Sequence, residues 1–293
     1  MTPATAPRPA ATTSGEALRA AAETLRRAGI DGARLDAEVL LAYVCGMNRS
    51  RLLAATRDPV GLDALAIFDA AVARRARREP IAYILGRREF WSLDFEVNRD
   101  VLIPRPETEL LVETAISLAR RRGLTRPRIA DVGTGSGCIA IALARELSAA
   151  ALWASDVSPP ALAVARRNAL RLGVASRIQF AEGDLLAPLR PEAPFDLICC
   201  NPPYVSSAAS LQPELAYEPT QALFAGADGM ATIRRLIAEA PECLRRGGSL
   251  LVEIGQGQAD AVRALAAASG FFRVDIRDDY AAIPRLLVAT RED

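Results

Sequence analysis

The residues best placed to do chemistry form a four-residue segment, Asn201-Pro202-Pro203-Tyr204, directly after an apolar run. Proline has no N–H to donate and its restricted φ stiffens the turn, so the Asn201 side chain and the Pro202 carbonyl could together accept from one NH2 group. Tyr204 offers a flat face on which a planar substrate could stack. The segment therefore predicts a site that orients an amide or an aromatic amine, with a proline turn that binds nothing as the alternative.

A glycine-rich loop, Gly133-Thr134-Gly135-Ser136-Gly137, follows an earlier apolar run. Glycines at alternate positions let a ligand approach the backbone and permit positive φ angles. A helix that begins near Gly137 presents unpaired N–H groups to an acceptor. No Gly-Lys-Ser/Thr follows, which excludes a phosphate-binding P-loop. The loop alone predicts a nucleotide-like ligand, and a purely structural tight turn is the alternative.

Carboxylates stand at the ends of the next two apolar runs. Asp156 lies nineteen residues beyond Gly137, where a carboxylate can accept hydrogen bonds from a ribose diol. Asp184 could accept from the exocyclic amine of adenine while Leu185 packs on the ring. A helix or turn cap is the alternative for Asp156, and a solvent-exposed turn is the alternative for Asp184.

The residue types that are missing exclude several mechanisms. The chain has no histidine, and each of its 36 basic residues is an arginine. A histidine base, a histidine metal site, a Ser-His-Asp triad and a Schiff-base lysine are therefore impossible, and we expect no metal in the site. The 35 acidic residues leave a net charge of +1, so no strong overall field attracts nucleic acid or anionic lipid. We expect neither direct DNA binding nor a membrane partner.

From residue 128 onward, short apolar runs alternate with amphipathic segments. The runs expected as strands are Arg128–Val132, Ala151–Asp156, Arg177–Ala181, Phe195–Cys200, Ser249–Ile254, Phe271–Ile276 and Arg285–Ala289. The segments expected as helices are Cys138–Leu147, Pro160–Leu172, Met230–Leu244 and Gln258–Ser269. This alternation predicts an α/β fold with a doubly wound, mostly parallel sheet whose last two strands form an antiparallel edge. In such a fold the ligand lies at the carboxyl ends of the strands.

The residues before this region predict a separate part of the chain. Apolar residues at helical spacing over 14–85 indicate a small bundle of short helices. Glu89–Asp94 and Phe95–Pro104 are expected as the two strands of a hairpin, and a helix is expected over Glu107–Arg122. The expected divisions are a disordered tail over 1–13, a helical domain over 14–85, a hairpin linker over 86–105 and a catalytic domain over 106–293.

The five cysteines are odd in number and have no CxxC spacing. Buried thiols in a reducing compartment are the expected interpretation. The first residues do not resemble a secretory signal, and no apolar run reaches the ~18 residues of a membrane span. We therefore expect a cytoplasmic protein.

Six segments taken together resemble the peptide chain release factor glutamine methyltransferases. These segments are Gly86–Trp91, Val101–Glu109, Gly133–Gly137, Asn201–Tyr204, Tyr217–Pro219 and Glu253–Gly255. The resemblance spans roughly residues 16–290, and Val101–Glu109 is a much more specific part of it than the glycine loop. It implies a seven-stranded class I methyltransferase domain, a hairpin linker and a helical N-terminal domain that helps to hold the release factor.

The resemblance also implies the reaction. S-adenosyl-L-methionine is the implied methyl donor and S-adenosyl-L-homocysteine the product, with no metal. The implied substrate is the glutamine in the Gly-Gly-Gln motif of class I release factors. The implied cofactor-binding residues are Gly133, Thr134, Gly135, Ser136, Gly137, Asp156, Asp184, Leu185 and Asn201, and the implied catalytic residues are Asn201, Pro202, Pro203 and Tyr204. Asn201 and Pro202 would accept the two amide hydrogens and so direct the nitrogen towards the methyl group.

The chain departs from the family at two places. Leu185 stands where an aromatic residue is common, and Asp278–Arg285 lacks the glycine that members usually carry before the matching arginine. Three other enzymes and one non-enzyme remain as alternatives. They are a glutamine methyltransferase acting on a large-subunit ribosomal protein, a DNA adenine methyltransferase, a dehydrogenase and a non-catalytic binding module. The dehydrogenase leaves the Asn201–Tyr204 segment unexplained.

Overall fold

The computed structural model of the 293-residue chain describes residues 12–292. The chain divides into two compact units, one ending at Leu85 and the other beginning at Gly86. The tail expected over 1–13 lies outside the described residues except for Thr12 and Thr13.

The first unit is a bundle of five helices around its own core. The helices are α1 (Ser14–Arg27), α2 (Ala33–Val44), α3 (Arg49–Ala54), α4 (Leu62–Ala76) and α5 (Ile81–Leu85). A capping box begins α1, because the Glu16 N–H donates to Thr13 Oγ1 while the Thr13 N–H donates to Glu16 Oε2 at 2.8 Å. Leu18, Leu40 and Phe68 are fully buried at the centre of the bundle.

A short hairpin opens the second unit, and its strands differ from the expected ones. They are β1 (Arg87–Phe90) and β2 (Leu93–Glu96), so the turn falls at Trp91-Ser92, inside the segment expected as the first strand. Both turn residues have positive φ, +53° and +55°, as a two-residue hairpin requires. Neither residue is the glycine or asparagine that usually marks such a turn, and for this reason the turn position predicted from the sequence was wrong.

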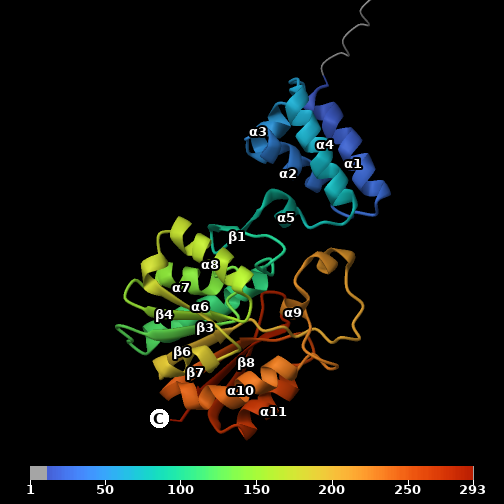
Figure 1. Ribbon diagram of the computed structural model, residues 1–293. Coiled ribbons are helices and arrows are strands. Elements are labelled where there is room, and N and C mark those ends of the chain that lie inside the picture. The colour runs from blue at the N-terminus through green and yellow to red at the C-terminus, as the bar shows by residue number, and fades with distance from the viewer. Residues whose placement is uncertain (1–11, 293) are drawn as a thin grey trace, which may run out of the picture. The chain divides into compact units, whose positions relative to one another are not determined.

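The second unit contains the seven-stranded sheet that the sequence predicted (Figure 1). Its strands are β3 (Arg128–Val132), β4 (Ala151–Asp156), β5 (Ile178–Glu182), β6 (Phe195–Cys200), β7 (Leu244–Glu253), β8 (Phe271–Asp278) and β9 (Pro284–Arg291). Their order is β5-β4-β3-β6-β7-β9-β8, and only β9 pairs antiparallel with its two neighbours. β7 begins five residues before the expected Ser249 because it continues through Arg245–Gly248.

Helices cover both faces of this sheet (Figure 1). One face packs against α6 (Glu109–Arg121), α7 (Cys138–Glu146) and α8 (Pro159–Arg171), and the other against α10 (Ala231–Cys243) and α11 (Ala259–Ala268). A single turn of helix, α9 (Thr220–Leu223), lies in the long connection after β6. The parallel strands read as nearly continuous apolar runs because both of their faces are buried.

The order of the strands reverses between β3 and β6. From β3 the chain moves to β4 and β5 on one side, and from β6 it moves to β7 on the other. The two strands end in register, with Val132 beside Cys200. The loop after β3 and the segment after β6 therefore leave the sheet side by side, which is where ligands bind in open α/β sheets.

The C-terminal hairpin forms without the missing glycine. Asp279 Oδ1 accepts from the N–H groups of Ala281 and Ile283, and its Oδ2 accepts from Arg285 Nε at 3.0 Å. Ala282 takes the left-handed conformation, with φ +58°. Hydrogen bonds to one carboxylate thus hold a turn in which glycine would be the easier residue.

Within residues 12–292, no helix is long and apolar enough to cross a membrane. All five cysteines are unpaired thiols, and four of them are buried.

Candidate active site

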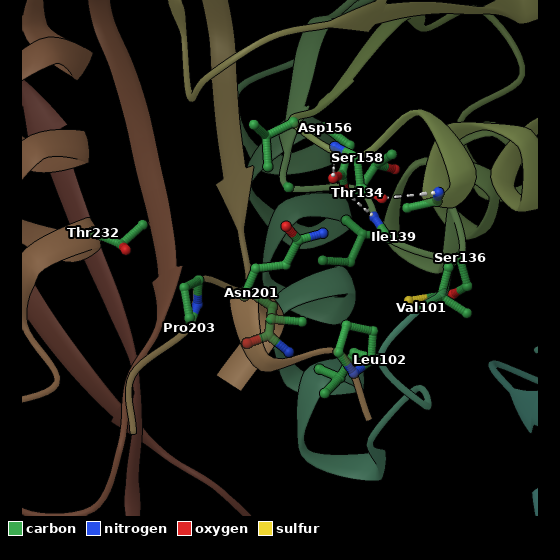
Figure 2. A pocket seen from close by; sticks show the side chains of 18 of the residues that line it. Val101, Leu102, Thr134, Ser136, Ile139, Asp156, Ser158, Asn201, Pro203 and Thr232 are labelled. Atoms are coloured by element: carbon green, nitrogen blue, oxygen red, sulfur yellow. Dashed lines mark hydrogen bonds between the residues drawn. The ribbon is translucent and has the colours of Figure 1, made fainter. Parts of the chain in front are cut away.

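A pocket opens at the carboxyl ends of β3, β4, β5 and β6, entirely within the second unit. Nine of the expected site residues line it, namely Gly133, Thr134, Gly135, Ser136, Asp156, Asp184, Leu185, Asn201 and Pro203. Gly137, Pro202 and Tyr204 are not among its lining residues. In Figure 2, Asn201 lies between Pro203 on one side and Thr134 and Asp156 on the other.

Backbone hydrogen bonds hold the glycine loop against the neighbouring strand. The N–H groups of Gly133 and Thr134 both donate to the Ser155 carbonyl, at 2.8 and 2.9 Å. Gly133 and Gly135 have positive φ, and a Cβ built on either would meet no atom within 4 Å. The loop therefore leaves open space on its pocket side.

Gly137 serves helix packing rather than access of a ligand to the loop. Its φ is +83°, and a Cβ there would lie 3.0 Å from Ile141 Cδ1 and 3.2 Å from Ala165 Cβ. This glycine lets α7 and α8 pack closely, so its contribution to the pocket is to fix where α7 begins.

Asp156 connects the end of β4 to the glycine loop. Its Oδ2 accepts from the Gly135 N–H at 2.8 Å, and its Oδ1 accepts from the Ser158 N–H at 2.9 Å. Burial raises the pKa of Asp156, while these backbone N–H groups act to lower it. A carboxylate has about four lone-pair positions, so two remain for the hydroxyls of a ribose.

A second carboxylate, Asp131, lies beneath the loop and is fully buried. Its Oδ2 accepts from Thr134 Oγ1 at 2.6 Å and from the Ala140 N–H at 3.1 Å, whereas Oδ1 has no partner among the described residues. Burial raises the pKa of Asp131 to about 7. Sequence analysis did not assign Asp131 a role, although it precedes the loop by two residues.

Asp184 and Leu185 form the part of the pocket wall contributed by the end of β5. Asp184 is exposed, and its carboxylate pairs with Arg235 at 2.5 Å. Leu185 has φ +48°, and its carbonyl accepts from Ser155 Oγ at 3.0 Å. Both residues stand beside the pocket, and their contact with an adenine ring stays a prediction.

Asn201 directly follows β6, and one half of its side-chain amide is hydrogen-bonded while the other half is not. Its Nδ2 donates to Thr108 Oγ1 at 3.0 Å. Its Oδ1 is buried and has no hydrogen-bond partner among the described residues. A buried oxygen without a donor is costly, and here it belongs to a residue that lines the pocket. The arrangement provides one fixed acceptor for a donor group of a ligand.

Thr108 and Glu253 continue the network behind Asn201. Thr108 Oγ1 donates to Glu253 Oε2 at 2.6 Å, and the Tyr204 hydroxyl lies 3.4 Å from Glu253 Oε1. Thr108 and Glu253 are 1% and 3% exposed. Burial raises the pKa of Glu253 to about 7, and burial together with the Glu253 charge raises that of Tyr204.

Sequence analysis missed Thr108 and Glu253 as site residues. Their positions did carry a signal, because Val101–Glu109 and Glu253–Gly255 are among the segments of the family resemblance. Nothing in the sequence indicates that these two side chains, which are 145 positions apart, form a hydrogen bond.

Of the other residues in the Asn201–Tyr204 segment, Pro203 lines the pocket, whereas contacts outside the pocket hold Tyr204. Pro202 is buried. The Tyr204 carbonyl accepts from Gln258 Nε2 at 3.1 Å, and a Cβ on Gly229 would lie only 2.3 Å from that carbonyl oxygen. The expected stacking of a substrate on Tyr204 stays a prediction, since the ring is not among the pocket-lining residues.

Glu218 joins two further segments of the pocket wall. Its side chain is 2% exposed, and its carboxylate accepts from Arg105 at 2.5 Å and from the Ile103 N–H at 3.1 Å. This contact brings Val101–Glu109 to Tyr217–Pro219, two segments of the resemblance that are more than a hundred residues apart.

The site thus has two chemically different sides. One presents glycine backbone and the Asp156 carboxylate, which suit a ribose and its neighbouring groups. The other presents the unpaired Asn201 oxygen, which suits an N–H donor. Among residues 12–292, no group of three or more side chains drawn from cysteine, aspartate and glutamate is arranged to hold a metal ion.

The sheet order and this pocket define a methyltransferase of the class I fold. Residues 106–277 match the family model described as the methyltransferase small domain, and residues 16–86 match the PrmC N-terminal domain. The fold is similar to that of a methyltransferase from Pyrococcus furiosus, with a TM-score of 0.52 and 17% identity over 75% of this chain and 99% of that one. It is also similar to the hMettl16 catalytic domain, with a TM-score of 0.56 and 19% identity over 75% and 80% of the two chains.

Sequence relatives narrow this class to one family. The release factor glutamine methyltransferase of Moorella thermoacetica is 43% identical over 281 residues, covering 95% of this chain and 98% of the relative. That of Cereibacter sphaeroides is 45% identical over 281 residues, covering 94% and 98%. The chain belongs to the release factor glutamine methyltransferase family.

Proposed function

We propose that this protein transfers the methyl group of S-adenosyl-L-methionine to the side-chain amide nitrogen of the glutamine in the Gly-Gly-Gln motif of class I peptide chain release factors. The observation that carries the proposal is the buried, unpartnered Asn201 Oδ1 at the edge of a pocket with a glycine loop and the Asp156 carboxylate on its other side.

The residues on the glycine-loop side fit the donor molecule. Asp156 would accept from the ribose hydroxyls, the Gly133–Gly137 loop would let the amino-acid part of the molecule approach the backbone, and Asp184 and Leu185 would flank the adenine. When bound, S-adenosyl-L-methionine supplies an electrophilic methyl group on a positively charged sulfur and leaves as neutral S-adenosyl-L-homocysteine.

Asn201 and Pro202 would then orient the acceptor. An amide nitrogen is a weak nucleophile because its lone pair is delocalised into the carbonyl group. The Asn201 oxygen and the Pro202 carbonyl would accept hydrogen bonds from its two N–H groups and hold the nitrogen in line with the methyl group. As the N–C bond forms and the S–C bond breaks, one of the two amide protons is released to water. Pro203 and Tyr204 keep the turn rigid, and Tyr204 is the proposed surface against which the glutamine amide stacks. Positioning of this kind can supply about 7–11 kcal/mol of a barrier.

We further propose that the helical unit ending at Leu85 helps to hold the release factor, and that residues 86–105 link it to the catalytic domain. This division follows the match of residues 16–86 to the PrmC N-terminal domain. A cytoplasmic location follows from the proposed substrate, since release factors act on ribosomes.

The test is to incubate the protein with isotopically labelled S-adenosyl-L-methionine and a class I release factor. We expect one labelled methyl group on the glutamine of the Gly-Gly-Gln peptide by mass spectrometry. A release factor with that glutamine replaced by alanine is the matched control and should stay unlabelled. Ribosomal proteins and DNA are offered in parallel, and preferential labelling of either would replace this proposal with one of the rival functions.

A further inference from the structure

We propose that Thr108 and Glu253 are positioning residues that decide which end of the Asn201 amide faces the pocket. The proposal rests on the function given above, because it concerns how the glutamine-orienting oxygen is held. Thr108 lines the pocket beside Asn201, whereas Glu253 is not among the lining residues, and we assign neither a contact with the substrate nitrogen. Both act through Asn201.

The direction of each hydrogen bond in this network fixes the orientation of the Asn201 amide. An ionised carboxylate can only accept, so Thr108 must donate its single hydroxyl hydrogen to Glu253, 2.6 Å away. The Thr108 oxygen can then only accept, and the group it accepts from is the Asn201 NH2 at 3.0 Å. The amide is therefore oriented with its nitrogen towards Thr108 and its oxygen towards the pocket.

The opposite orientation would defeat the site. It would place the Asn201 NH2 opposite the N–H groups of a substrate amide, so that donors would face donors. A neutral Glu253 permits this orientation, because a protonated carboxyl group can donate to Thr108 and release the threonine hydrogen to Asn201 Oδ1. Orientation of the amide is thus linked to the charge on Glu253.

Several groups act on that charge. Burial and the nearby carboxylate of Glu107 favour the neutral form of Glu253, whereas the hydrogen bonds from Thr108 and Tyr204 and the guanidinium of Arg285 favour the ionised form. The resulting pKa of Glu253 is about 7. The Glu253 charge in turn helps to raise the pKa values of the Cys138 and Cys200 thiols, and the Arg105 guanidinium acts to lower the pKa of Tyr204.

Two consequences are measurable with saturating donor. In the native protein kcat should rise with pH and level off above a midpoint near 7, since Glu253 is increasingly ionised. Glu253→Gln should lose this rising limb, because a glutamine can donate or accept and no longer fixes the direction of the network at any pH.

Thr108→Val removes the hydroxyl at nearly constant shape, and Thr108→Ser restores it. We expect kcat to fall about tenfold to a hundredfold in Thr108→Val, the range for leaving a buried polar group unpaired, and to recover in Thr108→Ser. Affinity for the donor and KM for the release factor should change far less. Thr114→Val is the matched control, because Thr114 is equally buried on the following helix and its hydroxyl instead accepts from Arg277.

A readout independent of the release factor is hydrogen exchange of the Asn201 side-chain NH2, followed by NMR of the full chain. We expect protection in the native protein, Thr108→Ser and Thr114→Val, and loss of protection in Thr108→Val. Protection without release factor methylation would refute the proposed function and leave the positioning role standing. Native kcat or retained protection in a folded Thr108→Val, or an unchanged pH profile in Glu253→Gln, would overturn the positioning role.

Discussion

The two sides of the pocket are built in contrasting ways. On the glycine-loop side, Asp156 is bonded to backbone N–H groups through both of its oxygens, and the loop is tied to Ser155 by its own backbone. On the Asn201 side, the acceptor oxygen has no partner among residues 12–292, and its orientation depends on side chains only.

We infer from this difference that the Asp156 side of the pocket provides affinity for the donor and that the Asn201 side increases the rate of transfer. Backbone N–H groups fix Asp156 before any ligand arrives, so this side can bind the donor in its resting geometry. The unpaired Asn201 oxygen gains its partner only when a substrate amide is present. An interaction of that kind favours catalysis when it is strongest in the transition state.

The largest expected effect comes from Asn201→Ala. Removing the acceptor should lower kcat by about a thousandfold, comparable to loss of one oriented polar group in other active sites. Affinity for S-adenosyl-L-methionine should fall less, because the Asp156 side is intact. Single-turnover methylation and calorimetric titration of the donor measure the two quantities. Equal methylation by this variant would contradict the assignment of Asn201.

The buried carboxylate beneath the glycine loop predicts a pH-dependent stability. The pKa of Asp131 is about 7 in the folded protein against an ordinary value of 3.8, so the folded state favours the protonated form. Its stabilising contribution is complete below the ordinary value and is lost as the pH rises through 7. Relative to Asp131→Asn, the free energy of unfolding of the native protein should therefore fall over that interval, by on the order of 2–4 kcal/mol.

Urea denaturation of both proteins at a series of pH values measures this difference, and contributions from Asp156 and Glu253 cancel in it. A difference that does not change with pH would show that folding leaves the pKa of Asp131 at its ordinary value.

On the glycine-loop side of the pocket, the substitution to compare with Asn201→Ala is Asp156→Ala. Loss of hydrogen bonds to a charged acceptor should weaken donor binding by about 1.5–3 kcal/mol. At saturating donor, kcat should stay within a fewfold of native, since the Asn201 network is untouched. A fall in kcat as large as that in Asn201→Ala would mean that the two sides do not divide affinity and rate.

The smallest expected difference is that between alanine substitutions at two glycines of the same loop. The Cβ added by Gly133→Ala meets no atom within 4 Å. This substitution should lower stability only through the strain of placing alanine in the left-handed conformation, about 1–2 kcal/mol. Gly137→Ala adds a Cβ against Ile141 and Ala165 and should cost about 1–3 kcal/mol more. Thermal unfolding measures both. Equal losses would refute the packing role given to Gly137.

The sequence predicted the sheet well because its signal is local. Arg128–Val132, Ala151–Asp156 and Phe195–Cys200 form strands with the expected bounds, since a strand buried on both faces is a continuous apolar run. The turn at Trp91-Ser92 was misplaced because its positive φ angles occur in residues that rarely adopt them.

For the site too, the sequence predicted only those features that neighbouring residues carry. The glycine loop and the segment Asn201–Tyr204 are motifs of neighbouring residues, and the sequence alone was enough to single them out, while their functional roles stay predictions. The partners of Asn201 were not found in this way, because Thr108 lies 93 residues away and reaches Asn201 only through the folded sheet. Tertiary hydrogen bonds between distant side chains leave no periodicity in a single sequence.

The most direct measurement of the central claim is a crystal structure of the protein with S-adenosyl-L-homocysteine and a Gly-Gly-Gln peptide. We predict that Asn201 Oδ1 lies about 2.9 Å from the glutamine amide nitrogen. Asn201 Nδ2 should still donate to Thr108, and the glutamine nitrogen should face the sulfur. A peptide amide held by other groups, with the Asn201 oxygen directed elsewhere, would contradict the account.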